Sequence, residues 1–205
     1  MQTGGILLLG GASARMGEAK ADLEWFGRPL AAHVADVLSA AVAGPVVAVA
    51  AVDQVLPELP SGVECVHDAV ADEGPLRGLE SGLIAIGDRA DVVFVASVDL
   101  PLLHPAFVRG LLAALTDEFD AVVPISDGHR HPLAAVYRTS VLATVSALLA
   151  EGVRGANALP DRIASQILDE ADLLALPGLV PADLDALFNV NTPEDLATAR
   201  LRFRP

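Results

Sequence analysis

The chain has 205 residues, of which 53% are hydrophobic and 20% are charged, and its formal net charge is −14. A chain of this length and composition can bury one sizeable core, which predicts a single domain over residues 1–205. The acidic balance argues against nucleic acid or an anionic membrane as a partner. A polyanionic ligand would therefore have to bind at a local basic site.

The single cysteine and the short apolar runs argue against disulfide-rich, multi-cysteine zinc-binding and membrane-spanning proteins. Cys65 is the single cysteine, which excludes an intrachain disulfide framework and a zinc site built from several cysteines, and we expect its side chain to be buried. The mean hydropathy is +0.49, but apolar runs such as residues 45–52 and 92–98 are far shorter than the ~20 residues of a membrane-spanning helix. The first residues lack the basic region of a secretion signal, which predicts a cytoplasmic protein.

The first part of the chain alternates short β-rich runs with longer stretches of helical spacing. Strands are predicted at residues 6–9, 46–52, 63–66 and 92–98, and helices at residues 29–42, 75–86 and 105–115. Pro29 and Pro105 suit the first turns of their helices. Continuous apolar strands joined by amphipathic helices predict an α/β fold with a mostly parallel sheet covered on both faces.

The later part of the chain has a less regular pattern. Strands are predicted at residues 121–124, 133–137 and 163–168, and helices at residues 140–149 and 193–203. No internal repeat, low-complexity segment or linker separates this part from the first. We therefore expect an irregular C-terminal part within the same domain.

The segment after the first predicted strand has the composition of an anion-binding loop. Gly10 and Gly11 allow the backbone to approach a ligand closely, so that its N–H groups can cradle phosphate oxygens. Arg15 and Lys20 add two of only 13 Lys and Arg residues. The alternative is a plain turn with two solvated cations. The spacing is neither that of the dinucleotide-binding G-x-G-x-x-G fingerprint nor that of a Walker loop.

An acidic residue, Asp99, follows the strand predicted at residues 92–98. Ligands of open α/β sheets bind at the carboxyl ends of the strands, so Asp99 is expected at the same edge as the glycine loop. A carboxylate at this edge can hold Mg²⁺ while substrate phosphates and water complete the coordination. The alternative is a helix cap, although His104 lies closer to the helix predicted from Pro105.

Five segments together resemble the molybdenum cofactor guanylyltransferases, a branch of the nucleotidyltransferases. They are the loop 8–20, which is similar to the signature L-A-G-G-x-S-x-R-M-G-x-x-K, and the segments 74–78 (GPLRG), 98–101 (VDLP), 131–137 (HPLAAVY) and 189–196 (NVNTPEDL). The loop and the VDLP segment are typical of the whole superfamily, whereas the last two segments indicate the branch. The resemblance implies a single-domain, Rossmann-like, three-layer α/β/α fold of the nucleotide-diphospho-sugar-transferase type.

The resemblance also implies a role for each matching residue. Arg15, Lys20 and Asp99 would be catalytic, and Asp99 and Asn191 would hold Mg²⁺. The nucleotide would be bound by Leu8, Leu9, Gly10, Gly11, Ser13, Arg15, Lys20, Asp68, Gly74, Pro75, Leu76, Gly78 and Asp99, and the acceptor by His131, Arg154 and Asn189. Alternatives remain for three of them, because Asn189 and Asn191 could be turn or cap residues and Arg154 a solvated loop cation.

The sequence departs from the family pattern at two places that affect which nucleotide it is expected to bind. Leu9 stands where the family has alanine, which should narrow the pocket without removing a charge. Residues 46–52 lack the asparagine that guanylyltransferases offer to the base, whereas the Gly10–Gly11 pair matches the guanine-using branch. The resemblance therefore favours GTP and leaves CTP as the second candidate.

The implied reaction transfers GMP from GTP to molybdopterin or Mo-molybdopterin, releases pyrophosphate and forms the guanine dinucleotide form of the molybdenum cofactor. Nucleotide contacts are expected from residues 1–115 and acceptor contacts from residues 116–205. The resemblance leaves room for transient contacts with proteins that supply molybdopterin or with molybdoenzymes. The alternatives are a nucleotidyltransferase for another small phosphorylated acceptor and a catalytically silent nucleotide-binding module.

Overall fold

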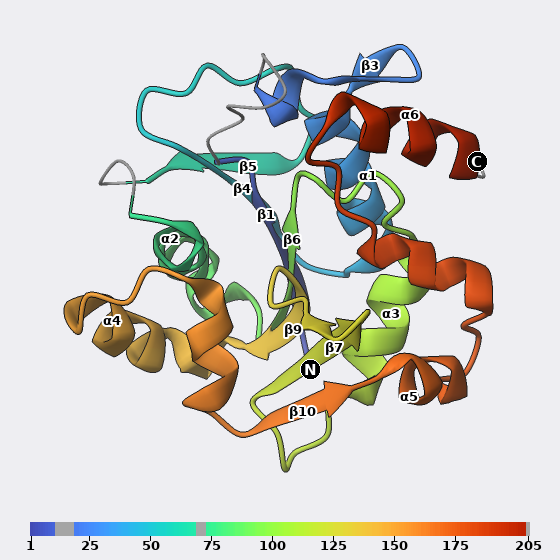
Figure 1. Cartoon of the computed structure of the whole chain (residues 1–205). Coiled ribbons are helices and arrows are strands. Elements are labelled where there is room, and N and C mark those ends of the chain that lie inside the picture. The colour runs from blue at the N-terminus through green and yellow to red at the C-terminus, as the bar shows by residue number, and fades with distance from the viewer. Residues whose placement is uncertain (11–18, 69–72, 204–205) are drawn as a thin grey trace.

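The structure, a computed structural model, describes residues 1–10, 19–68 and 73–203. Within these residues eight strands form one sheet, and Figure 1 shows it running through the middle of the molecule. The order across the sheet is β5 (Val63–His67), β4 (Val46–Ala50), β1 (Thr3–Leu8), β6 (Val92–Ser97), β9 (Ala134–Arg138), β7 (Ala121–Ser126) and β10 (Ser165–Leu168), and β8 (His129–Arg130) pairs with β7.

The sheet is mostly parallel, as predicted. The strands β5, β4, β1 and β6 are parallel neighbours, and so are β7 and β10. In this strand order β9 interrupts the parallel pairing, because it is antiparallel to both of its neighbours, β6 and β7. It joins the regular first part to the less regular later part of the sheet.

Helices cover both faces and form two apolar cores, so the predicted three-layer α/β/α fold is confirmed. Figure 1 shows α1 (Leu30–Ala41) and α3 (Pro105–Ala114) on one side of the sheet, and α2 (Pro75–Ile86) and α4 (Leu142–Ala150) on the other. Side chains alternate between the faces, as a strand buried on both sides requires. Leu7 packs into the core under α1 and α3, whereas Ile6 and Leu8 pack under α2.

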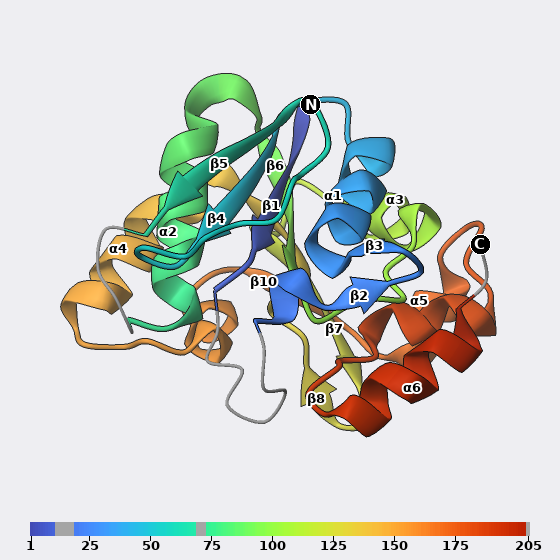
Figure 2. The ribbon, with the colours of Figure 1, turned by 90° about the horizontal axis from the view of Figure 1, so that it is seen from above.

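The remaining elements surround the rim of the sheet. The short strands β2 (Glu24–Trp25) and β3 (Arg28–Pro29) form a hairpin, which Figure 2 shows beside α1, and α5 (Glu170–Ala175) and α6 (Pro193–Arg202) belong to the C-terminal part. The described part of the chain also contains the 3₁₀ segments Lys20–Asp22, Gly87–Arg89, Thr139–Val141, Ala156–Asp161 and Pro181–Leu187. Among the residues that the structure describes, no helix is long and apolar enough to cross a membrane.

Three local predictions have different outcomes. His104 caps α3, since its ring nitrogen accepts the N–H of Ala106 at 3.2 Å. Pro29 lies one residue before the first turn of α1 rather than within it. The predicted burial of Cys65 is wrong, because Cys65 lies on the edge strand β5 and is exposed.

The register of the central strands brings two sequence motifs to one edge of the sheet. Leu8, the last residue of β1, is paired with Ser97, the last residue of β6. The backbone N–H of Val98 then donates to the Leu8 carbonyl at 3.0 Å. The start of the glycine loop and Asp99 therefore leave the sheet side by side, as the sequence predicts.

Candidate active site

A lysine, a carboxylate and an amide meet at this edge. The ammonium of Lys20 donates to Asp99 Oδ2 at 2.9 Å and to Asn191 Oδ1 at 2.7 Å. These residues are 79 and 171 positions from Lys20 in the sequence. The fold thus joins the end of the glycine loop, the end of β6 and the segment before α6 in one cluster.

Asp99 and Asn191 also make bonds that do not involve Lys20, one through the Asp99 side chain and two through the backbone of these residues. The Ser97 hydroxyl donates to the second oxygen of Asp99, and the N–H of Val190 donates to the Asp99 carbonyl at 2.9 Å. The N–H of Asn191 donates to Asp195 Oδ2 at 3.0 Å, and this bond is the main cause that lowers the pKa of the Asp195 carboxyl. The side chains of Lys20 and Asp99 are only 16% and 21% exposed, which limits screening by salt.

The oxygens of Asp99 and Asn191 fit a divalent cation of the magnesium type. Both are hard donors, and both accept a hydrogen bond from one cation, the Lys20 ammonium. The described residues contain no group of three or more His, Cys, Asp or Glu side chains that could hold a metal. A cation here would need further oxygens from substrate and water, which is how Mg²⁺ is commonly bound.

A second part of the edge brings Gly78 close to a half-buried carboxylate, that of Asp68. A Cβ added to Gly78 would lie 3.3 Å from Leu8 Cδ2 and 3.6 Å from Asp68 Oδ2, so α2 passes close to both residues. Asp68 Oδ1 is buried and has no hydrogen-bond partner among the described residues. Burial raises the pKa of the Asp68 carboxyl, against the opposing effects of the Ser81 hydrogen bond and of Arg77. An acceptor without a donor at this place suits a ligand that brings N–H or O–H groups.

The start of α2 is held by the chain around Arg154. Gly74 has a φ of +74°, and a Cβ there would lie 2.8 Å from the Arg154 carbonyl, so this position demands glycine. The same carbonyl accepts the N–H of Leu76 at 3.2 Å. The Arg154 guanidinium donates to Glu73 at 3.0 Å and to the carbonyl of Leu149 at 3.0 Å. These contacts give Arg154 a structural role, and acceptor binding by its side chain stays a prediction.

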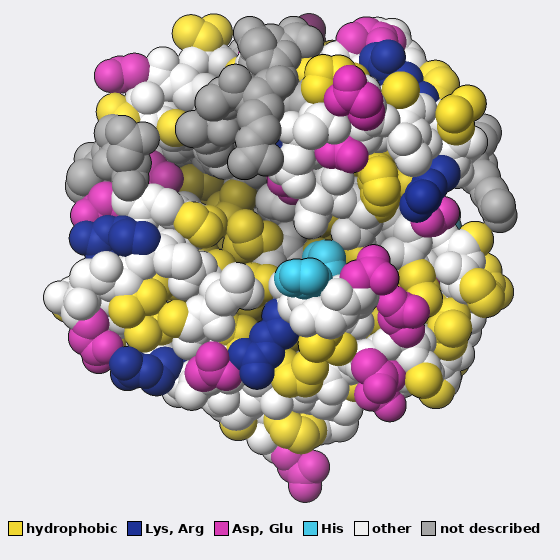
Figure 3. All heavy atoms as spheres, in the orientation of Figure 1, with side chains coloured by type: hydrophobic (Ala, Val, Ile, Leu, Met, Phe, Trp, Pro, Cys, Tyr) yellow, Lys and Arg dark blue, Asp and Glu magenta, His cyan; other side chains and the backbone are white. Residues whose placement is uncertain are grey.

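Two adjoining cavities extend from Asp99 across the later part of the sheet. The nearer cavity has a volume of about 270 Å³ and is lined by Pro75, Ser97, Asp99, Leu100, Arg130, His131, Pro132, Leu133, Ala134, Gly155, Ala156, Asn157 and Asn189. The farther cavity, of about 500 Å³, shares Arg130, His131 and Asn189 with it. Figure 3 shows a hollow in this face with hydrophobic side chains at its floor and histidine at its rim.

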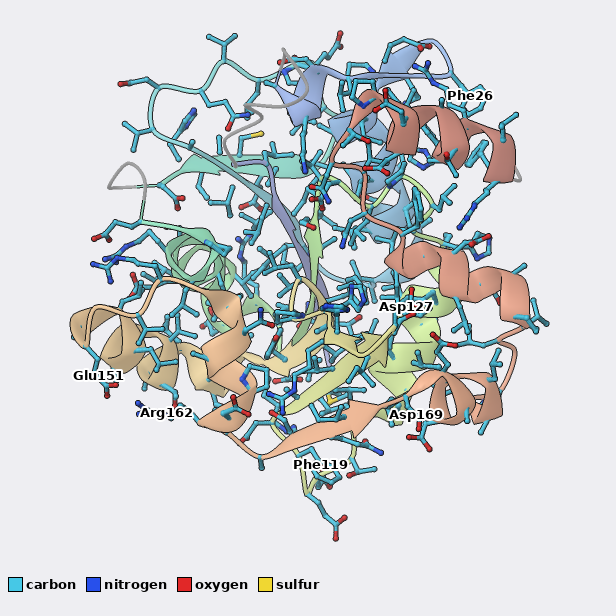
Figure 4. All side chains as sticks on the ribbon, viewed as in Figure 1. Phe26, Phe119, Asp127, Glu151, Arg162 and Asp169 are labelled. Atoms are coloured by element: carbon cyan, nitrogen blue, oxygen red, sulfur yellow. The ribbon has the colours of Figure 1, made fainter. Side chains whose placement is uncertain are left out.

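The farther cavity mixes an aromatic ring with charges of both signs. Arg202 lies over the Phe188 ring, 4.7 Å from its centroid, and pairs with Asp185 at 3.2 Å. Asp127, labelled in Figure 4, lies at the turn between β7 and β8 beside this cavity. Burial lowers the pKa of His131, and His129 lowers it further against the opposing effects of Ser126, Asp127 and Asp99, so the neutral imidazole is favoured.

Comparison with known proteins decides the family. The sequence pattern of the MobA-like NTP transferase domain matches residues 5–166. The probable molybdenum cofactor guanylyltransferase of Mycobacterium avium (strain 104) is 35% identical over 201 residues, which cover 96% of this chain and 94% of that protein. The chain belongs to the MobA-like NTP transferase family.

Solved structures agree with this MobA-like fold. The molybdopterin-guanine dinucleotide biosynthesis protein A of Archaeoglobus fulgidus superimposes with a TM-score of 0.74 at 22% identity, covering 97% of both chains. The 2-C-methyl-D-erythritol 4-phosphate cytidylyltransferase of Thermus thermophilus gives a TM-score of 0.66 at 17% identity, covering 98% of both chains. Guanine-named and cytidine-named proteins thus share the architecture, so the fold alone does not decide the base.

In this MobA-like domain eight of the predicted site residues lie in three groups, and the others lie elsewhere. Lys20, Asp99 and Asn191 are in direct contact. Leu8, Gly78 and Asp68 lie together, and His131 and Asn189 line the cavity that begins at Asp99. Leu9 is buried, Gly10 is exposed beside Ala51, Gly74 and Pro75 begin α2, and Leu76 is buried behind them. Gly11, Ser13 and Arg15 lie outside the described residues.

The sequence patterns do not single out two polar side chains that lie beside the predicted site residues. The first is Ser97, which lies two residues before Asp99 at the end of β6 and whose hydroxyl donates to the Asp99 carboxylate. Gln54 lies two residues after residues 46–52, the segment in which the family pattern has its asparagine. Its Oε1 accepts the Ala51 N–H at 2.9 Å, and its Nε2 approaches the Leu9 carbonyl at 3.4 Å. The tight turn that folds Gln54 back, with Asp53 at a φ of +58°, was not visible in the hydrophobic pattern.

Proposed function

We propose that this MobA-like nucleotidyltransferase transfers GMP from GTP to molybdopterin or Mo-molybdopterin, with release of pyrophosphate. The contact of Lys20 with Asp99 and Asn191 carries the proposal, because it gathers a cation and two metal-type oxygens at the edge where the glycine loop begins. The guanylyltransferase name of a relative that is 35% identical over 96% of the chain supports the choice of substrates.

The chemistry needs charge neutralisation more than it needs a base. The attacking phosphate monoester has a second pKa near ~6 and is largely a dianion at pH 7. The obstacle is the repulsion between this dianion and the triphosphate, so catalysis consists of positioning and electrostatic stabilisation. The neutral imidazole of His131 is consistent with a contact residue rather than an acid.

Each described residue of the site has a place in this scheme. Lys20 neutralises phosphate oxygens of the nucleotide, and Asp99 and Asn191 hold a divalent cation, for which Mg²⁺ is our proposal. When bound, such a cation withdraws charge from the phosphate oxygens and helps to orient them. Arg15, with Gly11 and Ser13 of the same loop, is proposed on the basis of sequence alone. The Asp68 carboxylate receives donors of the nucleoside.

The acceptor fits the two cavities beyond Asp99. Its phosphate must reach the nucleotide near Asp99, and the nearer cavity of about 270 Å³ is below the ~300–1,000 Å³ typical of small-molecule sites. A fused-ring acceptor would therefore extend past His131 and Asn189 into the farther cavity of about 500 Å³. The lining of the farther cavity comes entirely from residues 116–205, which supports our assignment of this part to the acceptor and of residues 1–115 to the nucleotide. The nearer cavity lies between the two parts, since Pro75, Ser97 and Leu100 also line it.

CTP stays the second candidate nucleotide. The end of β4 carries no asparagine, and the side-chain amide of Gln54 lies 3.4 Å from the Leu9 carbonyl. Both of its described contacts are with backbone, so it does not by itself identify guanine. Cytoplasmic location and contacts with molybdopterin-supplying proteins or molybdoenzymes remain predictions from the sequence.

The direct test follows the α-phosphate. Purified protein is incubated with molybdopterin, MgCl₂ and either α-³²P-labelled or γ-³²P-labelled GTP, and the same is done with CTP. We expect label from the α-position alone to appear in a molybdopterin dinucleotide, more from GTP than from CTP. A product formed only from CTP would show that the enzyme uses CTP rather than GTP. The absence of a product with either nucleotide would contradict the proposal.

A further inference from the structure

The Lys20 ammonium occupies the place that the proposed function gives to a metal ion. It lies within hydrogen-bond distance of Asp99 Oδ2, at 2.9 Å, and of Asn191 Oδ1, at 2.7 Å. We propose that Lys20 is an internal placeholder that closes the metal site until a nucleotide binds. The inference rests on the proposed role of Asp99 and Asn191 as metal ligands.

The two cations cannot use these oxygens together. Magnesium binds oxygen at about 2.0–2.1 Å and demands nearly ideal geometry, and an ammonium bonded to both oxygens crowds the position that the ion would need. Like charges a few Å apart in a site with little solvent also repel each other strongly. The side chains of Lys20, 16% exposed, and Asp99, 21% exposed, are largely shielded from solvent, whereas Asn191 is exposed. A metal ion therefore enters only when the ammonium leaves.

The oxygens are prepared to stay when Lys20 moves. Asp99 keeps the Ser97 hydroxyl on its other oxygen, and its carbonyl keeps the Val190 N–H at 2.9 Å. Asn191 keeps its backbone bond to Asp195 at 3.0 Å. Departure of the ammonium would leave the Asp99 carboxylate oriented by Ser97 and the backbone of Asn191 fixed by Asp195.

The residue type suits a cation that has to move. Of the 13 Lys and Arg residues in the chain, Lys20 is the only lysine. An ammonium is a compact point charge on a flexible four-carbon stem, whereas a guanidinium is a wide planar fork that prefers one fixed bidentate geometry. Triphosphate oxygens offer Lys20 a more negative partner than one carboxylate. A bound nucleotide would thus draw the ammonium away and open the metal site in the same step.

The consequence is that nucleotide and metal bind cooperatively, and that metal alone binds weakly. We test it by Mn²⁺ binding in the absence of any nucleotide, followed by electron paramagnetic resonance of the free ion. Lys20→Met keeps the stem and removes the competing charge. We expect it to bind Mn²⁺ at least fivefold more tightly than the native chain, within the ~5–150-fold range of typical coupling between sites.

Two further variants show where the gain arises. Arg130→Met removes one positive charge from the cavity that Asp99 lines. Because Arg130 pairs with Asp161 at 2.6 Å, its removal frees no oxygen of Asp99 or Asn191, and we expect no gain in Mn²⁺ affinity. Lys20→Met combined with Asp99→Asn should lose the gain. Equal Mn²⁺ affinities of the native and Lys20→Met chains, or an equal gain in Arg130→Met, would overturn the placeholder role.

The outcome also separates this inference from the proposed function. If Asp99→Asn weakens Mn²⁺ binding while Lys20→Met leaves it unchanged, the metal assignment stands and only the placeholder fails. If Asp99→Asn has no effect on Mn²⁺ binding, both are contradicted. Either result is obtained without GTP, molybdopterin or turnover.

A second measurement does not depend on the stability of a variant. Because Lys20 is the only lysine, labelling with ε-¹⁵N-lysine gives a single side-chain ammonium signal in the native chain. We expect this signal to shift on addition of a non-hydrolysable GTP analogue without metal, and to shift also at high Mg²⁺ without nucleotide. A signal that does not respond to Mg²⁺ at concentrations that saturate the Mn²⁺ site would contradict the exchange.

Discussion

Asp68 illustrates at the residue scale how a binding site can cost stability. Its Oδ1 is buried with no described partner, and burial raises its pKa above the ordinary value of 3.8. A carboxyl with a raised pKa binds its proton more tightly in the folded chain than in the unfolded one. Folding is therefore penalised once the carboxyl ionises, and the penalty develops as the pH rises from 3.8 through the raised pKa.

Asp68→Asn should remove that penalty. We expect the variant to unfold at a higher temperature than the native chain at pH 7, with the difference shrinking toward pH 4 as the native carboxyl takes up its proton. Nucleotide affinity should fall in the same variant, because the amide offers a weaker acceptor. Thermal unfolding across pH 4–8 measures the first effect and GTP titration the second. A stability difference that does not change with pH would contradict the assigned cause.

Asn189 and Thr192 separate acceptor binding from helix capping. The cap of α6 is Thr192, whose hydroxyl accepts the Asp195 N–H at 3.1 Å, so Asn189 is not the N-cap, whereas it does line both cavities. We expect Asn189→Ala to raise the KM for molybdopterin without changing GTP affinity. Thr192→Ala should instead lower stability by about 1 kcal/mol and leave the molybdopterin KM unchanged. A selective loss of GTP affinity in Asn189→Ala would contradict the division of the site.

At the element scale, α2 lies close to β1 because two of its residues lack side chains. A Cβ on Gly82 would lie 2.6 Å from Ile6 Cγ2, inside the sheet core, whereas a Cβ on Gly78 would meet the flexible end of Leu8 at 3.3 Å. Gly82 therefore sets the packing distance of the helix. Gly78 lies one turn earlier, beside Asp68, where the same closeness shapes the site.

Alanine at these two positions should have different effects. Gly82→Ala forces α2 away from Ile6, and we expect a loss of about 1–3 kcal/mol, as for other overpacked cores. Gly78→Ala gains about 1 kcal/mol of helix propensity against a small shift of Leu8, so its stability should change little while nucleotide binding weakens. Urea unfolding and GTP titration of both variants measure this. Equal destabilisation by the two substitutions would show that Gly78 is also a packing residue.

The elements that sequence reasoning predicted are those with a strong local pattern. The helix over residues 75–86 is observed as Pro75–Ile86, and the strand expected at residues 92–98 as Val92–Ser97. The hairpin of β2 and β3, the two-residue strand β8 and the short helix α5 were not predicted. They have two to six residues each, which is too short for a hydrophobic period.

At the scale of the whole molecule, the position of β9 could not be read from the chain. Its apolar run was predicted as a strand, but its insertion between β6 and β7, antiparallel to both, depends on contacts between distant segments. The cavities that extend from Asp99 depend on the same insertion, since His131 precedes β9 and Asn189 comes from the far end of the chain. By contrast, the edge shared by the glycine loop and Asp99 follows from parallel pairing and was predicted.

The formal net charge of the chain is −14, whereas the candidate site contains a positively charged side chain, that of Lys20. An anionic nucleotide meets general repulsion, so its affinity should depend on this local cluster. Removal of Asp99 tests the cluster without disturbing the fold, because the bond from Val190 to residue 99 uses the backbone carbonyl. The unfolding temperature and circular dichroism of Asp99→Asn provide the control.

The decisive measurement is pyrophosphate release from GTP in the presence of molybdopterin and Mg²⁺, with native protein and Asp99→Asn side by side. The account predicts release by the native chain that requires molybdopterin, and a loss on the order of a hundredfold or more in the variant, because metal stabilisation of the transition state contributes several kcal/mol. Near-native release by a folded Asp99→Asn at saturating Mg²⁺ would contradict a catalytic centre at this edge of the sheet.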